Sequence, residues 1–241
     1  MNRIRPQLKA LQAVLLPTTP GGPIPLTLAG DVDALIRAIG RKAGFAEMHM
    51  ALLAGVQWER IDEIGRRRAG MADPARLNIP LSEASLIIEH PGAVVDHVYL
   101  AFDGVIAALV NMTDTLGRLL NLAYGLGINQ RRASLIAVRD RCSATSSLGV
   151  VLFDHQYTAW LLKVRDLRGR CQHADVEDIL VNSAAPLGRR QQPNVDQAYC
   201  WKSPAQATPL VVYAQEALEA TVACVDASIR AVLANPSSPT K

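Results

Sequence analysis

The longest helical pattern in this chain runs from Val94 to Leu126 and reads VVDHVYLAFDGVIAALVNMTDTLGRLLNLAYGL. Its apolar residues recur at alternating steps of three and four, which is the spacing of one face of an α-helix. They are Val95, Val98, Phe102, Val105, Leu109, Met112, Leu116, Leu119 and Ala123. An apolar face of this length has to be buried against other helices, so the stretch predicts a helical core.

Helical patterns on both sides of this stretch predict an all-α fold. Asp31 is placed to cap a helix from Val32 to about Leu53, after an extended lead-in over Pro17–Gly30. The remaining helices are predicted at about Gln57–Met71, Ser82–Glu89, Asn129–Cys142, Val150–Cys171 and Leu210–Leu233. This order of elements is typical of an up-and-down helical bundle.

Two segments depart from the helical pattern. Asn78-Ile79-Pro80 marks a loop, and Ala174–Pro209 contains two short β-prone pieces, at 179–181 and 198–201. The second segment is therefore predicted to be a long loop or hairpin laid over the core before the last helix. The chain divides into a single helical domain, 1–233, and a disordered tail, 234–241. Within the domain, 31–91 is an N-terminal helical extension and 94–233 is the core of the bundle.

Length and composition exclude several classes of protein. The chain has 241 residues, of which 49% are hydrophobic, which suffices for a good-sized core and is too apolar for a disordered protein. Its four cysteines lie far apart with no pair at metal spacing, so neither a metal site nor a cofactor is expected. No stretch approaches the roughly 20 apolar residues of a membrane span, and the N-terminus is a poor signal peptide. We expect a cytoplasmic protein without a membrane partner.

Polar and charged residues gather in the middle of the chain. Leu116–His173 contains nine Lys or Arg and three Asp, although the whole chain carries a net charge of only +3. The predicted helix at 94–126 also has a polar stripe, made of Asn111, Asp114, Arg118 and Asn121. Because these residues are also three and four apart, they share one face, which is either a solvated surface or a polar groove.

The predicted helix that begins at Val150 ends in KVRDLRGRCQHAD, residues 163–175. This ending resembles the R-x4-6-H signature of the HEPN family, in which an arginine and a polar residue precede a histidine near a helix C-terminus. Arg168 and His173 occupy these positions, with four residues between them. The order of long helix, motif helix, loop and closing helix is also similar over roughly 94–233. Gly169 is the one departure, since family ribonucleases usually have a polar residue after the arginine.

The resemblance implies a metal-independent endoribonuclease, of the kind found in toxin–antitoxin and antiviral-defence systems, which works as a homodimer with both motif helices facing one cleft. His173 is then the general acid and base, Arg168 the phosphate clamp, and Arg165 and Asp114 are supporting residues. The basic segment is expected to bind RNA phosphates through five arginines, which are Arg131, Arg132, Arg139, Arg141 and Arg170. An antitoxin or another defence protein is the further partner implied.

The chemistry of the pair is consistent with these roles. A histidine titrates near pH 6.5 and so shuttles protons at neutral pH, while an arginine stays charged and grips two phosphate oxygens. Residues five apart on an ideal helix are turned about 140° from each other. Arg168 and His173 therefore share a phosphate only if the helix frays near Cys171 or a second subunit completes the site.

Three other interpretations stay open. The domain could be a catalytically inactive HEPN module that binds RNA, a nucleotide or a partner protein, and Gly169 favours this alternative. Arg168 and His173 could simply be cations favoured by the helix dipole at a C-terminal end. A purely structural helical adaptor would leave the basic segment without a role.

Overall fold

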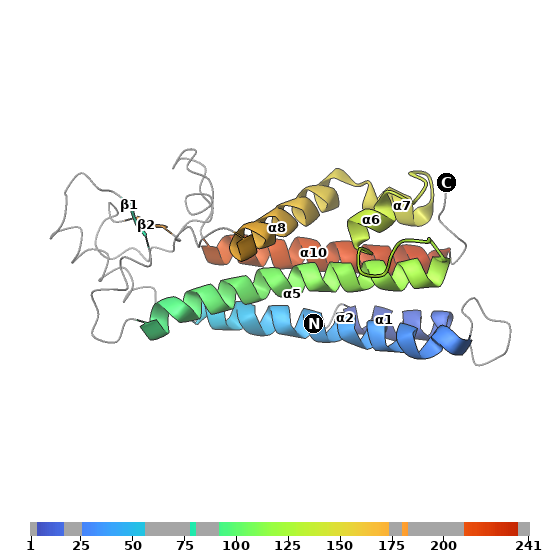
Figure 1. Cartoon of the computed structure of the whole chain (residues 1–241), viewed down its shortest axis with the longest axis horizontal. Helices are drawn as coiled ribbons and strands as arrows, with labels where there is room; N and C mark the ends of the chain where they lie inside the picture. The colour runs from blue at the N-terminus through green and yellow to red at the C-terminus, as the bar shows by residue number, and fades with distance from the viewer. Residues whose placement is uncertain are drawn as a thin grey trace. The chain divides into compact units, whose positions relative to one another are not determined.

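The computed structural model describes residues 4–16, 26–55, 78–80, 92–173, 180–182 and 210–235 of the chain. This part is helical apart from one pair of three-residue strands, which confirms the all-α prediction (Figure 1). The helices are α1 (Ile4–Leu15), α2 (Leu26–Ala54), α5 (Gly92–Tyr124), α6 (Leu135–Arg139), α7 (Ser147–Leu152), α8 (His155–His173) and α10 (Leu210–Ala234). The strands are β1 (Asn78–Pro80) and β2 (Leu180–Asn182).

The chain forms two compact units. The first contains Met1–Glu47, Ala107–Arg165 and Ala217–Lys241, and the second contains Met48–Ile106 and Asp166–Glu216. The four long helices α2, α5, α8 and α10 therefore contribute residues to both units. Within the first unit these four helices alternate in direction along the chain, as Figure 1 shows.

The first unit contains a helix that the sequence analysis did not assign. Ile4, Leu8, Leu11 and Leu15 of α1 are all buried, at the spacing of one helical face. The side-chain amide of Gln12 donates a hydrogen bond of 2.6 Å to Asp33 Oδ1 of α2. Gly40 of α2 faces the side chain of Leu8, so α1 packs lengthwise on α2.

The predicted start of the second helix is wrong. α2 begins at Leu26, so Asp31 lies inside the helix and does not cap it, and residues 26–30 are not an extended lead-in. The physical reason is the packing of α1 beside this part of α2, through Gln12 and Asp33. A neighbouring helix supports the extra turn, and this tertiary contact outweighs the local capping signal.

The single helix predicted from Val150 to Cys171 is in fact two helices, α7 and α8. Asp154 separates them, since its Oδ1 accepts a hydrogen bond of 2.8 Å from the backbone N–H of Gln156 at the start of α8. Thr158 Oγ1 in turn donates to the carbonyl oxygen of Leu152, at 3.0 Å. Phe153 is 44% exposed at the break.

The two helices with the clearest apolar periodicity were predicted well. α5 and α10 lie within two residues of their predicted bounds. In the second unit, the buried ring of Phe102 on α5 lies 6.4 Å from that of Tyr213 on α10, centroid to centroid. Gly104 of the same unit sits directly under the imidazole of His49, where no larger residue fits without a shift.

The two strands pair antiparallel, with Ile79 opposite Val181. β2 falls on a piece predicted to be β-prone, but its partner is Asn78–Pro80, which was predicted to be a loop. Because this pairing joins segments about 100 residues apart, the local sequence pattern of either strand does not predict its partner. The predicted helices at 57–71 and 82–89, the β-prone piece at 198–201 and the tail beyond Asn235 lie outside the described residues.

One described helix passes the length and composition test for a membrane span. Leu100–Tyr124 of α5 is 25 residues long, so this stretch is more apolar than the sequence analysis allowed. However, 67% of its most apolar window is buried inside the protein. This burial is typical of the core helix of a soluble protein.

Candidate functional site

The motif residues lie at the C-terminal end of α8. The helix continues without a break through Gly169 and Cys171 and is described as far as His173. Fraying near Cys171, one of the two ways to bring Arg168 and His173 together, is therefore absent. On a continuous helix the two residues point about 140° apart. The described part of one chain does not place them on one face, and the side chains of Arg170 and His173 lie outside it.

Arg168 is half-buried in the second unit, next to the buried Leu167. Its Nε atom is buried and makes no hydrogen bond to any residue that the structure describes. A buried donor without a partner costs about 1–3 kcal/mol, and more when the group is charged. Arg168 is thus held by packing and not by an ion pair in the described part of the chain.

Gly169 makes no close packing contact with the part of the chain that the structure describes. A Cβ atom added at this position would have nothing within 4 Å, apart from its own helix. The helix therefore has room for a side chain where HEPN ribonucleases usually have a polar one.

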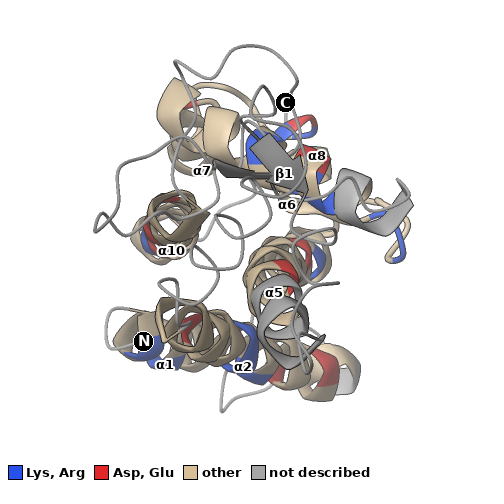
Figure 2. Cartoon of the chain, turned by 90° about the vertical axis from the view of Figure 1, so that its left-hand side faces the viewer, with Lys and Arg blue, Asp and Glu red and all other residues tan. Residues whose placement is uncertain are grey.

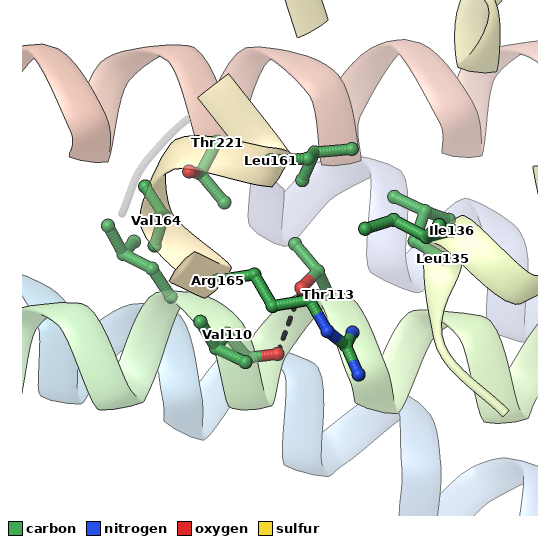
Figure 3. Close-up of a pocket in the computed structure, with 9 residues that line it drawn as sticks. Val110, Thr113, Leu135, Ile136, Leu161, Val164, Arg165 and Thr221 are labelled. Atoms are coloured by element: carbon green, nitrogen blue, oxygen red, sulfur yellow. Dashed lines mark hydrogen bonds between the residues drawn. The ribbon is translucent and has the colours of Figure 1, made fainter. Parts of the chain in front are cut away.

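The structure brings together the two residues proposed as supports. Arg165 of α8 and Asp114 of α5 form an ion pair of 3.1 Å in the first unit, with 47% and 20% of their side chains exposed. Arg165 also lines a small pocket, shown in Figure 3. The other lining residues are Leu109, Val110, Thr113, Leu135, Ile136, Leu161, Val164 and Thr221. The pocket is mostly aliphatic. The ion pair of Arg165 with Asp114 lies beside it and links α8 to α5.

The polar stripe on α5 is neither a simple solvated face nor a continuous groove. Asn121 is buried, and its side chain donates to the carbonyl oxygen of Ile128 at 2.8 Å and accepts from its N–H at 3.0 Å. Asp114 is occupied by Arg165. Arg118 alone is exposed and makes no ion pair with a described residue. It was placed on the stripe by the sequence but was not assigned a role.

The predicted basic helix at 129–142 is reduced to α6, with arginines on both sides of it. Arg131 and Arg132 lie in an exposed turn before α6, and Arg141 is exposed after it. Arg139 is bound to Asp140 at 2.9 Å, and its guanidinium lies 5.9 Å from the centroid of the Phe153 ring. Around α6, Arg139 is therefore paired with Asp140, whereas Arg131, Arg132 and Arg141 are exposed and form no ion pair with a described residue.

Two groups in the first unit have strongly raised pKa values, and neither is a plausible nucleophile. Burial, with a smaller contribution from Cys142, raises the pKa of Tyr124 to about 12. Burial likewise raises the pKa of the Cys224 thiol to about 12, although a hydrogen bond with Ser228 opposes the shift. Both groups are neutral at physiological pH, whereas a reactive thiol needs a lowered pKa.

Within the described residues, no three His, Cys, Asp or Glu side chains lie close enough together to hold a metal ion. The candidate functional residues are the predicted pair on α8 and the arginines around α6. Comparison with models of protein families, with curated proteins and with solved structures finds no match to this chain.

Proposed function

We propose that this protein is a metal-independent endoribonuclease of HEPN type, a toxin or antiviral-defence component that cuts RNA. The observation that supports this most directly is that Arg168 and His173, five residues apart, both lie on the helix α8. The motif requires a histidine in the C-terminal part of its helix, and His173 is the last residue of α8 that the structure describes. The unpaired Nε of Arg168 is a second, weaker support.

In the proposed reaction the substrate's own 2′-hydroxyl attacks the adjacent phosphorus, and the bond from phosphorus to the 5′-oxygen breaks. His173 accepts the proton of the 2′-hydroxyl and supplies one to the departing 5′-oxygen. Arg168 holds the phosphate oxygens on which charge develops. The products are a 2′,3′-cyclic phosphate and a 5′-hydroxyl, and no water is consumed in this step.

The continuous helix makes a second subunit necessary for this mechanism. Because Arg168 and His173 point away from each other in one α8, the arginine of one protomer has to act with the histidine of its partner. We therefore propose a homodimer with the His173 ends of two α8 helices near one another. Light scattering should give twice the 26.0 kDa of the chain, and a monomer at tens of micromolar would refute the composite site.

Single substitutions test the catalytic pair. His173→Ala and Arg168→Ala should each lower the cleavage rate by about 10²–10³, the usual effect of removing one preorganised group. Arg41→Ala, an exposed arginine on α2, is the matched control and should cleave normally. If His173→Ala and Arg41→Ala cleave RNA at the same rate, His173 is only a helix-terminal histidine.

The alternative is an inactive HEPN module that binds RNA, a nucleotide or a partner protein, and Gly169 is the feature that favours it. The ends of the RNA products distinguish the active enzyme from the inactive module. An active enzyme makes 2′,3′-cyclic phosphate ends in the presence of EDTA, and an inactive module binds RNA without making them. Gly169→Asn restores the polar residue of the family pattern in a position with free space, and it should raise the cleavage rate if the site is active.

A further inference from the structure

Three exposed arginines in the first unit are brought together by the way the chain leaves α5. After Tyr124 the loop turns at Gly125 and Gly127, both of which have positive φ. Asn121 then binds both backbone groups of Ile128. Further along, the backbone of Ser134 lies directly against Gly117. The segment 128–134 therefore runs back along the last turns of α5.

This path carries Arg131 and Arg132 past the turn of α5 that contains Arg118. On α5, Arg118 follows Gly117 and lies one turn before Asn121, so it borders the face that the returning segment covers. Arg131 and Arg132 lie between the two points where this segment is attached to α5. All three side chains are exposed. We define Arg118, Arg131 and Arg132 as the arginine patch.

The nearby carboxylates do not neutralise the arginine patch. Residues 111–142 contain five arginines and two aspartates. Asp114 is paired with Arg165, and Asp140 with Arg139. None of the three patch arginines makes an ion pair with a residue that the structure describes. Figure 2 marks basic residues in blue along α5 and α6.

The loop that carries Arg131 and Arg132 is locally ordered. Asn129 Oδ1 accepts a hydrogen bond of 3.0 Å from the backbone N–H of Arg131, and the carbonyl oxygen of Asn129 accepts one of 2.8 Å from that of Arg132. The exposed residues of the turn are Asn129, Gln130, Arg131 and Arg132. Guanidinium groups bind phosphates in a fork geometry, and side-chain amides bind base edges. A membrane-binding surface would instead carry exposed apolar or aromatic residues, and this turn has none.

From this geometry we propose that the arginine patch is a phosphate-binding surface for RNA, made of other residues than the catalytic pair. The inference rests on the proposed function in taking RNA as the partner. It adds Arg118 to the predicted RNA-binding residues. It removes Arg139, which forms an ion pair with Asp140 and lies over the ring of Phe153. Arg168 and His173 belong to the second unit, whereas the arginine patch belongs to the first.

The test is the salt dependence of RNA binding, measured with a 2′-O-methylated single-stranded RNA that cannot be cleaved. Each phosphate contact contributes about −0.7 to the slope of log K against log salt for a single strand. Arg131→Ala/Arg132→Ala should therefore make the slope shallower by about 1.4, and Arg118→Ala by about 0.7. The matched control is Arg41→Ala/Lys42→Ala, which removes two charges from α2 and should leave the slope as in the wild type.

Two results would overturn the proposal. One is an equal loss of slope in the patch variant and in the α2 control, which would mean that only net charge matters. The other is binding to phosphatidylserine vesicles that depends on the patch, with RNA binding that does not. If His173→Ala retains the full slope while cleavage is lost, the patch and the catalytic pair are separate, as proposed. If no cleavage is found but the slopes change as predicted, the ribonuclease proposal fails and the patch stands.

Discussion

Gly117 is the position where a single methyl group should disturb the first unit most. A Cβ atom built on Gly117 would lie 2.2 Å from the carbonyl carbon of Ser134, 2.5 Å from the N atom of Leu135 and 2.6 Å from the Cα atom of Ser134. All three are backbone atoms at the start of α6, so no side-chain rotation relieves the clash. Gly117→Ala should therefore push α6 away from α5.

The size of the effect follows from three contributions. Overpacking of a close contact costs typically about 1–3 kcal/mol. The displaced Ser134 caps α6 by accepting a hydrogen bond of 3.2 Å from Ala137, and loss of such a cap costs about 1 kcal/mol. Alanine gains about 1 kcal/mol over glycine in helix propensity, which offsets the cap. A net destabilisation of about 1–3 kcal/mol is expected, or roughly 2–12 °C in Tm for a chain of this size.

The same substitution at Gly169 provides the matched control. Nothing lies within 4 Å of a Cβ atom there, so Gly169→Ala should gain the helix propensity alone, up to about 1 kcal/mol. Urea and thermal unfolding, followed by circular dichroism, should thus show opposite signs for the two variants. If Gly117→Ala is as stable as the wild type or more so, the close approach of α6 to α5 is wrong.

Three further outcomes are expected. Asn121→Ala leaves the N–H and C=O groups of Ile128 without their partner and should cost about 2 kcal/mol in urea unfolding, and a loss below 0.5 kcal/mol would contradict the anchoring role. The raised pKa values of Cys224 and Tyr124 mean that the unfolded chain loses these protons first as the pH rises, so the free energy of unfolding should fall progressively above about pH 9. Cys224→Ser should flatten this fall in urea titrations at pH 8 to 10.5, and an unchanged profile would rule out Cys224 as a cause. Asp114→Asn breaks a partly exposed ion pair and should cost less than about 1 kcal/mol, so a larger loss would show that the pair is more than a surface link.

Local sequence was sufficient where helices bury a long regular face. The apolar spacing in α5 and α10 is repeated over many turns, so their bounds were predicted within two residues. The all-α class followed from the same periodicity. The candidate site depended on it too, since Arg168 and His173 were predicted near the end of a helix, and both residues lie on α8.

Tertiary contacts decided the rest. α2 starts early because α1 lies beside it, and the pairing of β1 with β2 joins residues that no local pattern connects. The arginine patch depends on two attachments, Asn121 to Ile128 and Gly117 to Ser134, which bring separate arginines to one surface. A sequence pattern reports which residue types share a helical face. Which faces meet depends on packing between segments that are distant in the chain, because those contacts contribute more free energy than the local preferences they override.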